Sequence, residues 1–270
     1  MFIRRVNPSC RLAIVESDST GYGYAYKKFA NQGYGELEQE FNVETVDLSR
    51  TRQVMREVPR PRYFKRGIWL SEDLFKVDFL VSLAKIKTHN MTTMSCCLKN
   101  FFGCLSVAEK WVYHPQIASV IADIHQVLKA DLWLCEGKPA LEGNGPVMGT
   151  PKDLGIMVAA NNPVACDAFV SSLIGFRPEK VRHIVEAARC GVGDIQLSHA
   201  DIRGYGGEKY PLSYVGLEQI VVTKTGLFIQ DVGQRVAYFG HLLHQQKSTL
   251  QILRGVIKRL RRYFGAAPKA

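Results

Sequence analysis

The apolar run VDFLVSLA at positions 77–84 constrains the fold more than any other part of the sequence. It lacks the alternation of polar and apolar side chains that marks a strand with one face in water. A near-continuous apolar pattern is typical of a strand buried on both faces of a sheet, with helices covering each side. The run therefore predicts an α/β protein.

Other segments repeat an alternation of helices and strands around this run. Residues 117–128 carry apolar side chains at helical spacing and lead directly into a short apolar run at 131–135. Residues 156–160 predict another strand, and residues 166–174 and 178–190 predict two more helices. We expect a mostly parallel or mixed sheet with helices on both faces. Further expectations are strands at 12–15, at 43–46 and around Ile202, a helix at 24–30, and a surface excursion without assigned function at 50–64.

The cysteine count indicates the redox compartment. The chain has 270 residues and seven cysteines, an odd number, and a chain of this length builds a core without disulfides. We therefore expect reduced cysteines and a cytoplasmic location. The N-terminus lacks the long apolar stretch of a signal peptide. The most membrane-like window, residues 154–175, carries Asn161, Asn162, Pro163 and Asp167 near its centre, which argues against a spanning helix.

The net charge of +10 is concentrated at the C-terminal end. Residues 232–270 contain eight basic and no acidic side chains, so the rest of the chain is nearly neutral. Apolar residues recur at helical spacing between Leu250 and Phe264, which predicts a basic amphipathic helix. We therefore expect an α/β domain at 1–205, a short β extension at 206–231 and a basic helical tail at 232–270.

The densest group of charged and polar side chains follows the long apolar run. Lys85, Lys87 and His89 come directly after it, and Lys99 and Asn100 lie in the next element. Ligands of open α/β sheets bind beyond the carboxyl ends of strands, so these cations predict a site for phosphate or carboxylate. His89 is the candidate general acid or base because histidine titrates near neutrality. Two lysines that end a strand are also common on a solvated surface, and the spacing leaves that alternative open.

A glycine-rich loop follows the strand expected at 131–135. Its residues Gly143 and Gly145 would let the backbone approach a ligand closely, and Glu142 is a candidate metal ligand or proton acceptor. The spacing differs from the dinucleotide-binding fingerprint, so an ordinary glycine loop is the alternative.

Asp167 places a carboxylate within an otherwise apolar helical segment. A buried carboxylate requires a partner, and a lysine of the group after the apolar run is the expected one. Asn161 or Asn162 is expected to cap the helix that starts near Val164.

These residues together form the predicted site. All of its charged members, Glu142 included, follow strands whose carboxyl ends share one edge of the sheet, so we expect them to converge on one pocket. The assigned roles are catalysis for His89, Lys99 and Asp167, and ligand binding for Lys85, Lys87, Asn100, Gly143 and Gly145.

The cysteine spacing bears on the cofactor. Cys96, Cys97 and Cys104 lie near one another, and the remaining cysteines are isolated. Adjacent cysteines followed by a gap match neither the CxxCxxC run of iron–sulfur proteins nor a zinc knuckle. The spacing argues against an iron–sulfur cluster and favours buried thiols that pack as small apolar side chains. The identity of any other cofactor is left unknown.

Five motifs occur in one order along the chain: the run from Val77 to His89, Leu98 to Gly103, His114, the loop from Glu142 to Gly149, and the segment from Asn162 to Asp167. Their order and spacing resemble the family called domain of unknown function 362, over roughly residues 10–205. Many members of that family carry a ferredoxin-like segment with two four-cysteine motifs, usually after this domain. This sequence has no such motif, so the resemblance does not extend to an electron-transfer role.

Two functions from different classes fit the sequence. The first is an enzyme or cofactor-dependent protein that binds a small anionic molecule in a crevice at the strand ends, with His89 in acid–base chemistry. The second is a non-catalytic scaffold held at an anionic membrane surface, on its inner face, by residues 244–264. Packing of the tail's apolar stripe on the body is the alternative for that helix. The nearly neutral body and the lack of a recognisable stacking platform argue against nucleic acid, and the oligomeric state is left open.

Overall fold

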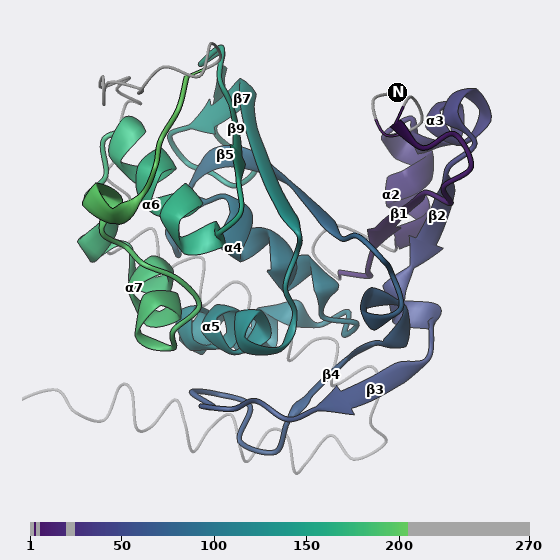
Figure 1. Cartoon of the computed structure of the whole chain (residues 1–270), viewed down its shortest axis with the longest axis horizontal. Coiled ribbons are helices and arrows are strands. Elements are labelled where there is room, and N and C mark those ends of the chain that lie inside the picture. The colour runs from purple at the N-terminus through teal and green to yellow at the C-terminus, as the bar shows by residue number, and fades with distance from the viewer. Residues whose placement is uncertain (1–2, 4–5, 20–24, 205–270) are drawn as a thin grey trace, which may run out of the picture. The chain divides into compact units, whose positions relative to one another are not determined.

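The computed structural model describes residues 3, 6–19 and 25–204 (Figure 1). Its centre is a five-stranded sheet in the order β6-β5-β7-β8, with β9 also paired to β7. This confirms the prediction of an α/β protein with a mixed sheet. Strands β5 (Val81–His89) and β7 (Leu132–Glu142) are parallel, whereas β6 (Thr93–Ser95), β8 (Thr150–Lys152) and β9 (Met157–Ala160) run antiparallel to their neighbours.

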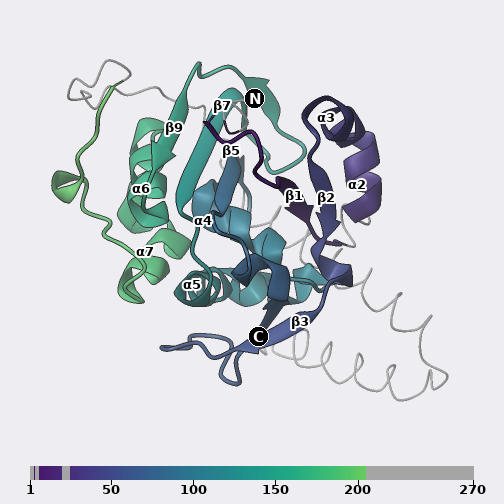
Figure 2. The same cartoon turned by 45° about the vertical axis from the view of Figure 1, so that its right-hand side comes forward.

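The helices lie on one face of this sheet (Figure 2). Helices α4 (Cys97–Asn100), α5 (Ile117–Val127) and α6 (Pro163–Leu173) cover that face, and α7 (Arg182–Arg189) packs on α5. Alternate side chains of β5 and β7 are buried under them because successive residues of a strand point to opposite faces. The buried side chains on this face include Ala84, Ile86, Trp133 and Cys135.

The opposite face of the sheet is open in the described part of the chain. Leu83 on β5 is 70% exposed and Met157 on β9 is 74% exposed. The apolar run at 77–84 is therefore not buried on both sides there, and the expectation of helices on both faces of the sheet is wrong for the described residues, where they cover one face. Its first residues also precede β5, and Val77 and Phe79 are exposed.

Two smaller sheets complete the described structure. Strands β1 (Ala13–Glu16) and β2 (Glu44–Asp47) pair in parallel, with α2 (Ala25–Asn31) and α3 (Tyr34–Phe41) between them in sequence. Strands β3 (Gln53–Arg56) and β4 (Ile68–Ser71) form an antiparallel pair.

Among the described residues no strand is centred on Ile202, so that prediction is wrong: the Ile202 side chain packs on the core, and only the neighbouring Arg203 forms a β-bridge. The expected β extension at 206–231 and helical tail at 232–270 lie outside the described residues.

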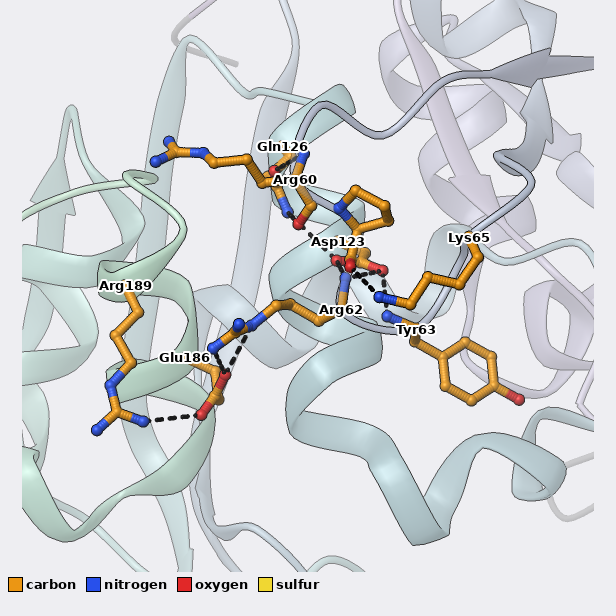
Figure 3. Close-up of polar contacts among 9 residues, drawn as sticks. Arg60, Arg62, Tyr63, Lys65, Asp123, Gln126, Glu186 and Arg189 are labelled. Atoms are coloured by element: carbon orange, nitrogen blue, oxygen red, sulfur yellow. Dashed lines mark hydrogen bonds and ion pairs between the residues drawn. The ribbon is translucent and has the colours of Figure 1, made fainter.

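Residues 50–64, predicted as a surface excursion, contain β3 and are fastened to two helices through a buried carboxylate (Figure 3). Asp123 on α5 is fully buried and accepts hydrogen bonds from the backbone N–H groups of residues 62–64 at 2.7 to 2.8 Å. The Arg62 guanidinium also pairs with Glu186 on α7, 3.0 Å away. A buried carboxylate with several N–H donors holds a loop in one place, so this segment is a fixed part of the fold.

Replacing this carboxylate should be costly. We expect Asp123→Ala to lower the free energy of unfolding by roughly 2–4 kcal/mol, because buried N–H groups lose their acceptor. Asp194, whose side chain is 53% exposed, offers a matched control, and Asp194→Ala should cost less than about 1 kcal/mol. Denaturant unfolding of both variants measures the difference. Equal losses would show that Asp123 does not anchor the segment.

Candidate functional site

The carboxyl end of β5 is built from two loops that pack closely together. The hydroxyl of Thr88 donates to the carbonyl of Gly143 at 2.9 Å, and the N–H of Asn90 donates to the carbonyl of Gly145 at 3.1 Å. A Cβ atom on Gly145 would overlap the carbonyl oxygen of Thr88. The two glycines predicted as ligand-binding residues thus bring the glycine loop against the strand end.

A pocket of about 180 Å³ lies beyond this strand end. It is lined by the turn after β5, by the first turn of α5 and by the segment that leads into α7. None of its lining residues is an aspartate or glutamate, within the part of the chain that the structure describes. The polar and basic side chains around it are Thr92, Thr93, His114, Gln116, Ser119, Lys180, Arg182 and His183.

Two helices begin at the pocket, and this adds to its positive potential. Neither α5 nor α7 has an acidic residue in its first turn, and neither has a side-chain cap at its N-terminus. The N-terminal end of a helix carries partial positive charge and free N–H groups, which favour a bound anion. Exposed Lys180 and Arg182 form no ion pair with a described carboxylate, so their charges are available to such an anion.

His183 is the most unusual side chain in the lining. It is 1% exposed, and neither of its ring nitrogens has a hydrogen-bond partner among the described residues. Its Nε2 atom lies 3.8 Å from Oδ2 of Asp167, which is an ion-pair distance if the ring is protonated. A buried polar group without a hydrogen bond is costly, so a bound ligand would supply what this ring lacks.

Backbone strain is present at the rim. Thr93 has a φ of 67°, in the left-handed region that a β-branched residue rarely adopts. Such conformations cost of order 1–3 kcal/mol and cluster at ligand sites.

His89, the last residue of β5, is buried beside this pocket. Burial lowers its pKa to about 2, and the neighbouring Lys99, His114 and Lys87 act in the same direction. The ring is therefore neutral near pH 7. Its Nδ1 accepts the N–H of Met91 at 3.1 Å, which leaves the proton on Nε2 as a donor. In this setting His89 is a hydrogen-bond donor, and acid catalysis by it requires a bound anion that raises its pKa.

Lys87 and Lys99 form a second cationic layer next to His89. Burial, followed by repulsion from Lys87, lowers the pKa of Lys99 to about 7. Burial, followed by repulsion from Lys85, lowers the pKa of Lys87. Lys99 has no ion pair with a described carboxylate, and its Nζ lies 5.6 Å from the ring centroid of Phe102. Two partly buried lysines with no counter-ion in the described part of the chain are the kind of perturbed charges that mark functional sites.

The other predicted site residues have partners elsewhere. Lys85 is exposed and pairs with Glu136, and Glu142 pairs with Lys152 at 3.2 Å. The side-chain amide of Asn100 donates to the hydroxyl of Ser82 at 3.1 Å. The structure therefore groups only three of the predicted charged residues, namely Lys87, His89 and Lys99.

Asp167 is fully buried, and its partners are not lysines. Its carboxylate accepts the backbone N–H of Cys97 at 2.9 Å and that of Leu98 at 3.1 Å, and it faces His183. Burial raises its pKa, and the contact with His183 opposes this shift. The expectation of a lysine partner is thus wrong, because Asp167 caps the start of α4.

Four cysteines converge on the same region, which their spacing in the sequence does not reveal. Cys96 and Cys97 at the start of α4 meet Cys135 on β7 and Cys166 on α6. Cys135 and Cys166, isolated in the sequence, are therefore part of a cluster, whereas Cys104 is not. The expected absence of an iron–sulfur cluster stays a prediction. Glu142, the predicted metal ligand, belongs to neither of the described groups of potential metal ligands.

Lys180, Arg182 and His183 were missed by the sequence analysis. Their signal is a run of basic residues at the start of a helix, where the helix dipole favours acidic ones. His114 was noted only as part of a family motif, and it lines the pocket.

An α/β protein with a cation-lined pocket at a strand end is the class that this geometry defines. The chain belongs to the family described as a domain of unknown function (DUF362), whose model matches residues 2–172. The pocket residues Lys180, Arg182 and His183 lie beyond that match. A thylakoid-associated protein of Synechocystis sp. is 25% identical over 182 residues, which cover 65% of this chain and 55% of that protein. This chain thus spans little more than half the length of that relative.

Two further comparisons bear on structure and location. No solved structure matches the chain. Within the described residues, no helix has both the length and the apolar character needed to cross a membrane.

The buried cation at position 99 yields a prediction about stability. Its folded pKa of about 7 lies below the ordinary value of 10.5, so the unfolded chain binds more protons between these values. Wild-type stability should therefore rise with pH across that window. We expect Lys99→Met to raise the melting temperature, most at about pH 6 and least near the upper end of the window. Thermal unfolding at several pH values measures this.

Lys129, an exposed lysine after α5, provides the control. Lys129→Met should leave the melting temperature nearly unchanged at every pH. A rise in the melting temperature of Lys99→Met that does not vary with pH, or a fall at about pH 6, would show that the charge of Lys99 does not destabilise the fold.

Proposed function

We propose that the protein binds a small anionic ligand, through a phosphate or carboxylate group, in the pocket beyond β5. The observation that carries this proposal is the lining: four basic side chains, two helix N-termini and no described carboxylate. A site with this potential attracts anions and repels cations. The four basic side chains are His114, Lys180, Arg182 and His183.

The lining also supplies the means to orient an anion. The planar guanidinium of Arg182 matches the geometry of phosphate and carboxylate oxygens. The hydroxyls of Thr93 and Ser119 are hydrogen-bond groups at the same pocket. Buried His183, which has no hydrogen-bond partner among the described residues, would donate to the ligand from within. This combination of groups favours specific binding of one anionic group over nonspecific electrostatic attraction of anions to the surface.

The same arrangement gives His89 and Lys99 a role in chemistry. A bound negative charge favours the protonated forms of both groups, and so raises both pKa values. Lys99, with a pKa of about 7 before binding, would then be a cation near the occupied pocket. His89 would move toward the range in which histidine transfers protons. We include acid–base catalysis by His89 in the proposal on this basis.

Sulfate, which keeps its charge across neutral pH, is a suitable probe of the pocket. We expect isothermal titration calorimetry of the full-length protein to give saturable sulfate binding, and Arg182→Gln to weaken it roughly 10-fold through the loss of a charge-assisted hydrogen bond. Binding should tighten between pH 8 and pH 6, because Lys99, with a pKa of about 7, gains its proton there. Acetate in place of sulfate tests for a carboxylate ligand.

Arg177 is the matched control, since it is exposed and does not line the pocket. Arg177→Gln should change sulfate affinity less than about twofold. Equal effects of the two substitutions, or no saturable binding of either anion, would refute the pocket as the binding site.

A second candidate function is attachment to an anionic membrane surface. The eight basic and no acidic residues of 232–270 support it, as does the thylakoid association in the name of the relative. A basic amphipathic helix lies in a membrane interface without crossing it. In this proposal the protein is cytoplasmic and peripheral on the inner face of the membrane, and it does not exclude anion binding in the pocket.

Vesicle flotation tests this second candidate. Full-length protein should float with vesicles that contain phosphatidylserine and stay behind with neutral phosphatidylcholine vesicles. Reversing four charges should abolish flotation, because each basic residue near the surface contributes about 1 kcal/mol. The combined substitutions are Lys258→Glu, Arg259→Glu, Arg261→Glu and Arg262→Glu. Unchanged flotation of this variant would contradict attachment by the tail.

A further inference from the structure

Four cysteine side chains lie near one another inside the core, and they come from three separate elements. Cys96 precedes α4 and Cys97 is its first residue, while Cys135 lies on β7 and Cys166 on α6. All four are at most 2% exposed. Their meeting is a result of the fold, because the sheet and two helices must pack before the sulfur atoms come together.

The separations of the sulfur atoms match a single tetrahedral metal ion. The Sγ atom of Cys166 lies 3.7 Å from that of Cys97 and 3.8 Å from that of Cys135. The Sγ atoms of Cys96, Cys97 and Cys135 all lie within 4.8 Å of one another. Four thiolates bound to zinc at about 2.3 Å in a tetrahedron have sulfur atoms roughly 3.8 Å apart. Cys96 and Cys166 fall in different groups of potential metal ligands, so closing all four sulfur atoms around one ion requires these two side chains to move closer together.

The same separations disfavour a multi-iron cluster. The four thiolates of such a cluster are divided among two or more iron atoms with sulfides between them, so they cannot all be as close together as the ligands of a single ion. An ordinary apolar role also explains less. Cys104 and Cys190 are buried at 8% and 4% exposure, and neither belongs to the described groups of potential metal ligands. Burial of a cysteine is therefore not sufficient to place it beside other cysteines in this protein.

We propose that Cys96, Cys97, Cys135 and Cys166 bind one thiophilic metal ion, with Zn²⁺ as the first candidate. Zinc has no redox chemistry and accepts four sulfur ligands in a closed, fully buried structural site. The ion would join α4, β7 and α6 at one point. This inference is independent of the anion pocket, because no cysteine lines that pocket.

Binding must release protons. Cysteine binds zinc as the thiolate, so each thiol that becomes a ligand must lose its proton when the metal ion enters. One Zn²⁺ that takes four thiols becomes a tetrathiolate complex with a net charge of −2, and four protons leave to solvent. Affinity should therefore fall as the pH is lowered. Asp167 positions one of the ligands, since its carboxylate accepts the N–H of Cys97 at 2.9 Å.

Cobalt(II) titration of the full-length, reduced and metal-free protein tests the proposal. Co²⁺ takes the same tetrahedral thiolate sites as Zn²⁺ and gives visible and near-ultraviolet bands that report the number of sulfur ligands. We expect one Co²⁺ per chain with the spectrum of a tetrathiolate complex, and full displacement by one equivalent of Zn²⁺. A Co²⁺ spectrum without thiolate bands, or with those of only one or two thiolates, would overturn the proposal.

Two variants separate this site from general effects on folding. We expect Cys166→Ser to weaken Co²⁺ binding more than about 100-fold, because losing even a partner behind a metal ligand costs about 10- to 100-fold. Cys104→Ser, the matched buried control, should retain the spectrum and the affinity. Equal loss in both variants would overturn the site. If Cys166→Ser fails to fold, the titration of the wild-type protein still decides, since its stoichiometry and spectrum need no variant.

Discussion

The buried carboxylate of Asp167 is the interaction on which the described structure depends most. It joins three helices at one point, since it lies on α6, caps the first N–H groups of α4 and faces His183 on α7. A carboxylate that is shielded from water must be surrounded by hydrogen-bond donors. The contacts of this one side chain therefore fix the three helices relative to one another. The thiols of Cys97 and Cys166 lie beside it, and the anion pocket begins at His183. Both proposed sites are thus built on the same anchor.

The second constraint is electrostatic. Lys87 and Lys99 repel each other in a partly buried space beside His89, and this opposes folding. A fold selected for stability alone would place a carboxylate or an apolar residue among them. Locally unfavourable charges of this kind persist at sites where a ligand supplies the missing partner. The strained backbone of Thr93 at the same place agrees with that account.

The sequence alone predicts the local structure better than the meeting of distant residues. Periodicity and apolar runs predict the α/β class, the core of β7 and the helices α5 and α6, and the predicted asparagine cap is confirmed at Asn162, which accepts the N–H groups that begin α6. These features depend on neighbours in the chain. The partners of Asp167, the convergence of Cys135 and Cys166 with the pair at 96–97, and the burial of Lys99 depend on packing between separate elements. The spacing of residues along the chain does not predict such contacts between distant elements.

The central claim is that an anion binds in the pocket beyond β5, and locating one there is the most direct test. A crystal structure of the full-length protein grown with selenate would give an anomalous signal for the anion. The account predicts a peak in the pocket, within hydrogen-bond distance of the Arg182 guanidinium and of a ring nitrogen of His183. Selenate bound only at other surfaces, with the pocket empty of it at saturating concentration, would contradict the account.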